Sequence, residues 1–269
     1  MRGQRSDAPF FAALAVLGGA YVLLVAAMVL ADLTYTSPGH LLAALRSADI
    51  RHSIQLSLFS CSAAALLSLL VAVPLGYLLA RERFRGRWLV DALVDIPIVL
   101  PPLVVGLSLL ILFQVKLGGV SIEAWFGRLG FAVTYAVPAV VLAQFAVAAA
   151  FAIRTMRTVF EQLNPRAEHV ALTLGCSRAQ AFTRVALPQA RRGMLAAFTL
   201  AWARSLGEFG PILVFAGATR GRTEVLSTSV FLELSVGHLE TAVAVSLLMI
   251  AVAALVLVLV RWLGKEQAL

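Results

Sequence analysis

The feature that most constrains this chain is a series of apolar segments long enough to cross a lipid bilayer. The first runs from Phe10 to Ala31 and is nearly unbroken. A transmembrane helix needs about 20 mostly apolar residues. Over all 269 residues, 61% are apolar and 13% are charged, whereas about 25% are charged in soluble proteins. The sequence therefore predicts an all-α, polytopic membrane protein with a single transmembrane domain, residues 1–269.

Six membrane-crossing helices are predicted from these segments. We place them at residues 10–31, 53–80, 88–113, 136–153, 193–216 and 241–260. The external loops are then expected at residues 32–51, 116–135 and 217–238. The third helix contains three prolines, which remove helical hydrogen bonds and clash with the preceding turn. It should therefore not be one straight rod.

The positive charges indicate how these helices are oriented. A net charge of +8 would suggest a nucleic-acid partner in a soluble protein, but membrane proteins concentrate Lys and Arg in their cytoplasmic loops. With both termini in the cytoplasm, 15 of the 22 Lys and Arg residues lie on the cytoplasmic side and 6 lie outside. Topology explains the charge, so we expect a multi-pass protein of the cytoplasmic (inner) membrane in contact with lipid, and no nucleic-acid partner.

Residues 164–188 form a polar interruption between the fourth and fifth predicted helices. Asn164 can cap a helix that starts at the following proline, and Gly175 can adopt the left-handed turn that ends it. Ser177 then begins S-R-A-Q, which is a capping box, and Pro188 should stop the second helix. We call residues 164–188 the cassette. Two short helices around one turn, on the cytoplasmic side, are typical of a docking surface for another protein.

The cassette also carries a resemblance to a known family. Its motif E-x6-G-x9-V-x-L-P is made by Glu168, Gly175, Val185, Leu187 and Pro188. This order resembles the EAA loop of ABC importer permeases, through which they engage a cytoplasmic ATPase.

Neighbouring residues extend the comparison in both directions. Ala171 fits the family pattern, whereas His169 and Val170 stand where a second acid and an alanine are usual. The stretches ARSLGEFGP (203–211) and DIPIVLPPLVVGL (95–107) resemble the molybdate/tungstate branch of the family, to which sulfate permeases are close. The resemblance covers residues 53 to the C-terminus.

The resemblance implies a function and two sets of site residues. It implies a type I importer permease that works as a homodimer with two cytoplasmic ATPase subunits, which hold ATP and Mg²⁺, and with an external solute-binding protein that delivers an oxyanion. The residues expected to couple to the ATPase are Glu168, His169, Ala171, Gly175, Val185, Leu187 and Pro188. The residues expected at the pore or gate are Asp95, Pro101, Pro102, Arg204, Gly207, Glu208 and Gly210.

Arg204 and Glu208 are the most informative charges within the predicted spans. Exposure of either to lipid would cost at least roughly 2.5–3.5 kcal/mol, and their i, i+4 spacing puts them on one helical face. They are either a self-neutralising pair or a guide for an anion, and Asp95 is an alternative partner for Arg204. The sequence G-E-F-G-P that starts at Gly207 predicts a break or kink in the fifth helix.

The remaining patterns argue against an enzyme. The sequence has no G-x-x-x-x-G-K-[ST] phosphate loop, so ATP hydrolysis is expected on a partner chain. Its four histidines lack metal-ligand spacing, and its two cysteines are predicted at different depths, so we expect neither a metal site nor a cofactor in this chain. The alternatives are a sulfate/thiosulfate permease or an ATP-independent channel or secondary carrier. A carrier should show coupling residues or internal repeats, and neither is evident.

Overall fold

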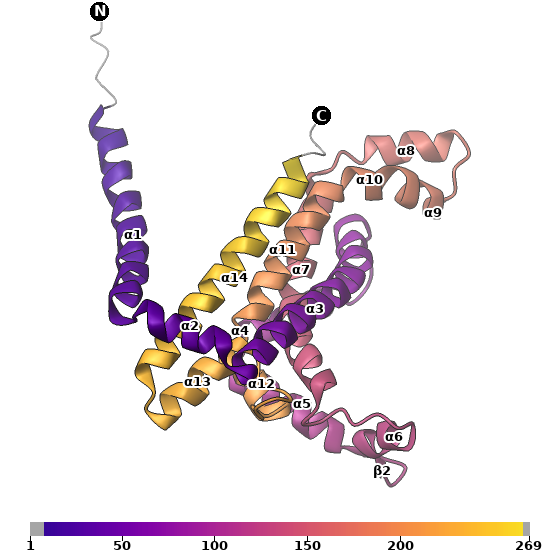
Figure 1. Ribbon diagram of the computed structural model, residues 1–269. Helices are drawn as coiled ribbons and strands as arrows, with labels where there is room; N and C mark the ends of the chain where they lie inside the picture. Colours follow the sequence, from indigo (N-terminus) through magenta and orange to yellow (C-terminus); the bar gives the residue numbers. More distant parts are fainter. Residues whose placement is uncertain (1–7, 266–269) are drawn as a thin grey trace, which may run out of the picture.

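The computed structural model describes residues 8–265, which are almost wholly helical (Figure 1). The long elements are α1 (Ala8–Tyr35), α3 (Ala48–Arg81), α7 (Val137–Gln162), α11 (Arg191–Leu206) and α14 (Leu239–Lys265). Shorter helices are α2 (Pro38–Arg46), α4 (Arg87–Val99), α5 (Pro102–Gln114), α6 (Ile122–Arg128), α12 (Gly210–Phe215) and α13 (Leu226–Val236). The cassette holds α8 (Arg166–Thr173), α9 (Arg178–Ala181), the π-helix η1 (Phe182–Ala186) and α10 (Leu187–Gln189).

The predicted spans correspond to these helices. Four helices, α1, α3, α7 and α14, are long and apolar enough to cross a membrane, and α4 with α5, bent by 115° at the break, adds a fifth if the pair is one span. Residues 8–265 thus hold four or five such spans, whereas six were predicted. The expectation that residues 88–113 are not one rod is thus confirmed. The segment expected to be the fifth span, 193–216, is divided between α11 and α12.

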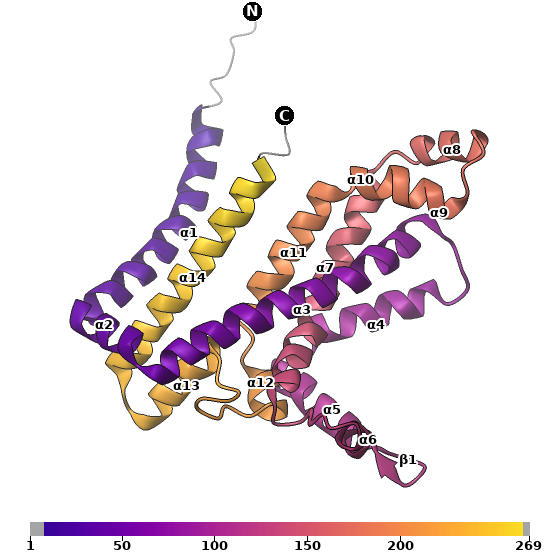
Figure 2. The same cartoon turned by 45° about the vertical axis from the view of Figure 1, so that its right-hand side comes forward.

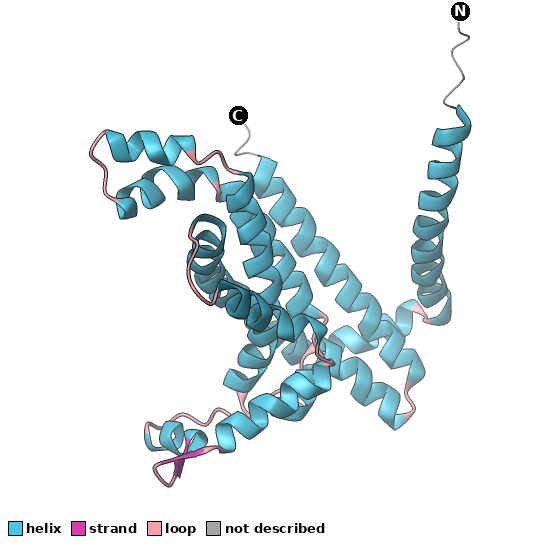
Figure 3. Ribbon diagram, turned by 180° about the vertical axis from the view of Figure 1, so that it is seen from behind, coloured by secondary structure: helices cyan, strands magenta, loops and turns pink. Residues whose placement is uncertain are grey.

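The expected loops contain more regular structure than the sequence suggested. The segment 32–51 was expected to be a loop, which is wrong: α1 continues to Tyr35 and α2 and the start of α3 follow. The segment 116–135 holds a two-stranded antiparallel ribbon, β1 (Lys116–Leu117) with β2 (Val120–Ser121), and α6 (Figure 3). The helix α13 occupies much of 217–238.

The core is the bundle of α3, α7 and α11, which pack on one another. Small residues let these helices approach closely, as in other membrane bundles. A Cβ atom on Gly76 of α3 would lie 2.8 Å from the backbone nitrogen of Arg157 on α7. The chain reverses direction around this bundle, so the start of α1, the end of α14 and the cassette lie at one end of the molecule (Figures 1 and 2). The helices α2, α6 and α13 lie at the other end.

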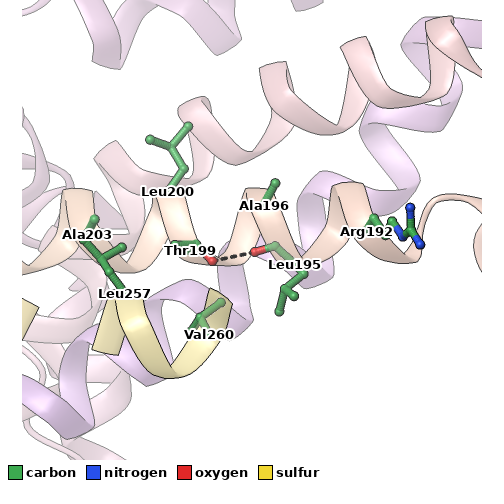
Figure 4. A pocket seen from close by; sticks show the side chains of 8 residues that line it. All are labelled: Arg192, Leu195, Ala196, Thr199, Leu200, Ala203, Leu257 and Val260. Atoms are coloured by element: carbon green, nitrogen blue, oxygen red, sulfur yellow. Dashed lines mark hydrogen bonds between the residues drawn. The ribbon is translucent and has the colours of Figure 1, made fainter. Parts of the chain in front are cut away.

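An apolar groove of about 500 Å³ lies between α11 and α14 (Figure 4). Thr199 is one of its few polar residues, and its hydroxyl donates to the carbonyl of Leu195 within the same helix. Arg192 stands at one end of the groove. Such a lining suits hydrocarbon and offers little to an oxyanion, so the candidate site lies elsewhere.

Candidate functional site

Six of the seven expected pore residues line one cavity of about 370 Å³. The cavity lies where the break between α4 and α5 faces the break between α11 and α12. Its lining residues are Pro101, Pro102, Leu103, Arg204, Gly207, Glu208, Phe209 and Gly210. The expected residue that does not line it is Asp95.

Two glycine and proline contacts hold the broken helices together. A Cβ atom on Gly210 would lie 2.9 Å from Cβ of Pro102, and one on Gly106 would lie 2.7 Å from Cα of Pro211. Each break therefore has a proline that interrupts its own helix and touches a glycine of the other helix pair. The residue before Pro101 is extended, as residues before proline prefer. The predicted break at the sequence G-E-F-G-P is confirmed.

Arg204 and Glu208 form the expected ion pair, with 2.6 Å between guanidinium nitrogen and carboxylate oxygen. The Glu208 side chain is 1% exposed and that of Arg204 is 30% exposed. The guanidinium also lies over the ring of Phe151, 5.7 Å from its centroid, which is a cation–π distance. Arg204 thus remains the one accessible charge at the cavity among the described residues that line it.

Asp95 does not pair with Arg204, so that alternative is wrong. Both of its carboxylate oxygens accept from Arg154 on α7, at 2.7 Å each. One turn earlier on α4, Asp91 accepts from Arg157 at 2.7 Å. These two ion pairs fasten α4 to α7. The sequence analysis missed them, although acids four residues apart on one segment and arginines three apart on another were a usable signal.

The cassette has the turn that the sequence predicted. Gly175 has φ of +89°, in the left-handed region, and the backbone N–H of Cys176 donates to the carbonyl of Ala171. Ser177 and Gln180 form both hydrogen bonds of the capping box, at 3.2 and 2.8 Å. Asn164 accepts from the backbone N–H two residues later.

Pro188 does not end the second helix, which corrects that expectation. The π-helix η1 precedes it, α10 contains it, and α11 starts two residues after α10 ends. A wider π turn accommodates the proline, whose ring would otherwise clash with the carbonyl four residues earlier. The cassette therefore continues as helical turns almost directly into α11.

Glu168 is buried, although the sequence analysis expected it at the docking surface. It is 7% exposed. Its Oε2 accepts from the Tyr77 hydroxyl at 2.6 Å, and its Oε1 accepts from Arg81 at 3.0 and 2.9 Å. Arg81 also donates to the carbonyl of Leu163, just before α8. We call Tyr77, Arg81 and Glu168 the clamp, because it joins the cassette to the last turn of α3.

The other cassette residues divide between surface and interior. His169 and Pro188 are exposed, whereas Ala171, Val185 and Leu187 are partly buried. Three apolar side chains that the sequence analysis did not select are exposed at the cassette surface: Val170, Leu172 and Leu174, at 56%, 36% and 80%.

No metal centre is found among residues 8–265, in which no group of three His, Cys, Asp or Glu side chains could hold an ion. Cys61 is buried in α3 and Cys176 lies in the cassette, and both are free.

A family model for the inner membrane component of binding-protein-dependent transport systems matches residues 72–267. The chain belongs to this family. The match includes the cassette and the whole lining of the cavity, and it identifies a permease subunit in the inner membrane. The chain is therefore a multi-pass transport component, and nothing in its own residues indicates catalysis.

Curated relatives are similar over most of their length. The chain is 35% identical to the sulfate permease CysT of Escherichia coli (strain K12), over 76% of this chain and 72% of that protein. It is 35% identical to the molybdate/tungstate permease WtpB of Pyrococcus abyssi, over 79% and 78%. It is 37% identical to the molybdenum permease ModB of Mycobacterium bovis, over 76% of each.

Solved structures agree on the fold. A bacterial alginate ABC transporter in complex with an alginate-bound periplasmic protein superimposes with a TM-score of 0.74 at 18% identity, covering 97% of this chain and 95% of that one. A second structure of a bacterial alginate importer gives 0.68 at 20% identity, over 97% and 96%. The expected all-α ABC permease fold is confirmed.

Proposed function

We propose that this permease imports a tetrahedral oxyanion of the molybdate/tungstate class, as a homodimer driven by two cytoplasmic ATPase subunits and supplied by an external solute-binding protein. Molybdate or tungstate permeases are among the relatives that it resembles over three quarters of its length. The observation that carries the ATP-driven part is the clamp, because it gives the cassette a rigid connection to the membrane bundle.

The clamp supports a lever mechanism. A partner that moves the cassette would pull on α3 through Glu168 and Arg81, because that buried contact is the shorter route into the bundle. It would pull on α11 through the continuous backbone after Ala190. The helix α11 carries Arg204 at its other end, so motion at the cassette reaches the cavity. Alternating access follows when the two broken helix pairs separate and close again. ATP and Mg²⁺ belong to the partner ATPase.

The coupling residues act in three ways in this proposal. Glu168, Gly175 and Pro188 set the shape of the cassette and its attachment to α3 and α11. His169, with the exposed Val170 and Leu174, contacts the ATPase. Ala171, Val185 and Leu187 hold the short helices against one another. The cassette and both chain termini would then lie in the cytoplasm, and the whole chain is one transmembrane domain.

Arg204 is the residue that we propose to contact the anion. It is the accessible cation at the cavity, while Glu208 keeps it in place when no anion is present. The backbone N–H of Gly210, at the start of α12, supplies a further donor, whereas the N–H of Gly207 already donates to the carbonyl of Ser205. Asp95 acts away from the cavity, where it fastens α4 to Arg154.

The test is uptake of labelled anion into proteoliposomes that contain the permease, its ATPase and its binding protein. ATP-dependent uptake of molybdate or tungstate that excess sulfate does not inhibit supports the proposal. Uptake of sulfate in preference to molybdate and tungstate would favour the second candidate function, a sulfate permease. The similarity to CysT supports that candidate. Uptake without ATP would reject the ATP-driven mechanism in favour of a channel or carrier.

A further inference from the structure

A second polar cavity lies at the end of the molecule opposite the cassette and has no role in the proposed transport path. It has a volume of about 230 Å³ and lies between α2, the start of α3, the segment before α13, α13 itself and α14. Figure 2 shows these helices at one end of the molecule. Its polar lining residues are His40, Ser47, Asp49, Arg220, Glu224, Glu233 and Thr241. We call it the acidic cavity.

Glu224 is unusual in this cavity because its carboxylate is buried. It is 1% exposed, and neither of its carboxylate oxygens has a partner with full hydrogen-bond geometry. The neighbouring Ser229 hydroxyl, which has a weak contact with this carboxylate, already donates to the Ser53 hydroxyl and the carbonyl of Val225. Buried carboxylates are normally paired or hydrogen-bonded, because an isolated buried charge is costly. The arginine that lines the cavity, Arg220, already pairs with another acid, because its guanidinium lies 2.6 Å from Glu233. Glu233 also contacts His238, at 3.1 Å.

The charges that line the cavity do not balance. Three carboxylates, those of Asp49, Glu224 and Glu233, face one arginine. His40 also lines the cavity but lies 3.1 Å from a further acid, Glu240. Arg46 and Arg51 do not line the cavity. Such a surplus repels an oxyanion and attracts a cation.

The spacing of the carboxylates selects the kind of cation. Among residues 8–265, no three acidic, histidine or cysteine side chains are grouped closely enough to hold a metal ion. An ammonium or guanidinium group is different, because its three to five N–H donors point in several directions and can reach separated acceptors. The cavity volume also exceeds the roughly 30 Å³ of one water many times, so it can take the end of a long side chain.

We propose that the acidic cavity receives a Lys or Arg side chain of the external solute-binding protein when that protein docks. This inference rests on the proposed function, which supplies the partner and puts this end of the molecule outside. The inserted cation compensates Glu224 and Asp49. The contact thereby ties α2, α3 and α14 together only while the binding protein is present.

The experiment compares Glu224→Gln with the wild-type permease, in nanodiscs with its ATPase. Asp32→Asn is the matched control, because Asp32 is a half-buried acid near the end of α1 that does not line the cavity. Affinity for the binding protein is measured by surface plasmon resonance. Loss of one partner of a buried charge pair commonly weakens binding by about tenfold or more. We expect that loss for Glu224→Gln, a smaller loss for Asp49→Asn, and less than a twofold change for Asp32→Asn.

A second measurement keeps the test independent of folding. In the absence of the binding protein, Glu224→Gln should raise the melting temperature, because it removes an uncompensated buried charge. Equal affinity of a well-folded Glu224→Gln variant and wild type would overturn the proposal. A Glu224-dependent rise in melting temperature on adding Ca²⁺ or Na⁺ would overturn it in favour of an inorganic ion. If wild type itself binds no external protein, the proposed function fails instead.

Discussion

The carboxylate of Glu168 lies 2.9 Å from the guanidinium of Arg81, and both side chains are nearly buried, at 9% and 13% exposure. One residue belongs to the cassette and the other to the last turn of a membrane-spanning helix. Exposed ion pairs contribute little to stability, but removal of one partner from a buried pair costs about 3–5 kcal/mol. Variants at this contact should therefore distinguish the docking of a partner from the transmission of that partner's motion to the membrane helices.

We predict that Glu168→Gln leaves the ATPase bound but uncouples its hydrolysis from uptake. Tyr77→Phe should cause a weaker defect, since it removes one hydrogen bond, worth about 1 kcal/mol. The measurements are co-purification of the ATPase and the ratio of ATP hydrolysed to anion imported. The control is Arg178→Gln, which breaks an exposed ion pair between the cassette and Glu82, the residue after α3. This variant should behave as wild type. A fully coupled Glu168→Gln transporter would show that the clamp does not transmit motion.

Gly175→Val should misalign α8 and α9 and abolish productive docking while the protein still inserts into the membrane. No atom lies within 4 Å of a Cβ at this position, so the cost is the left-handed backbone alone, which a β-branched residue resists. Gly221→Val provides the control, because Gly221 has φ of +68° and equally open surroundings at the other end of the molecule. It should keep the ATPase. Normal coupling in Gly175→Val would reject the docking assignment.

Arg204→Ala should destabilise the permease more than Arg204→Ala combined with Glu208→Ala. The single change leaves a buried acid without a partner, at a cost of about 3–5 kcal/mol, whereas the double change removes both charges. Thermal unfolding of the purified protein measures the difference. A stable double variant that cannot transport would show a role for the pair beyond neutralisation. Equal stability of single and double variants would show that the pair is energetically irrelevant.

Stability should also depend on pH through Glu224. Burial raises the pKa of this carboxyl above its ordinary value of 4.5, with Asp49, Glu233 and Arg220 facing it. The folded state then holds the proton more tightly than the unfolded chain. The stabilisation is complete at pH values below the ordinary pKa. It is lost as the pH rises through the raised pKa of the folded protein. The melting temperature of wild type minus that of Glu224→Gln is the quantity to measure. This difference should fall from pH 4 to pH 8. A difference that is constant with pH would contradict this.

Reporter fusions should test the orientation. Enzymes fused after Arg87 and Arg192 should be active in the cytoplasm, and those inserted in residues 217–238 should be active outside. A cytoplasmic signal from residues 217–238 would overturn the orientation and would move the acidic cavity to the wrong side for an external partner.

Local chemistry explains which features the sequence predicted well. The turn at Gly175, the capping box of Ser177 and the breaks near Pro101 and Pro211 depend on neighbouring residues only, and all appear in the fold. The stop expected at Pro188 does not appear. The burial of Glu168 was not predictable in this way. It depends on Tyr77 and Arg81, which come 91 and 87 residues earlier. The pairing of Asp95 with Arg154 likewise depends on how α4 packs on α7, for which apolar periodicity gives no signal.

The ion pair of Arg204 with Glu208 has a consequence for the membrane potential. A lone arginine carried through the field would exchange about 2.3 kcal/mol with each 100 mV. The two residues lie one helical turn apart and carry opposite charges, so a movement of α11 that keeps them together displaces almost no net charge. Opening and closing of the cavity should therefore be nearly independent of voltage, and any current during turnover belongs to the transported ion.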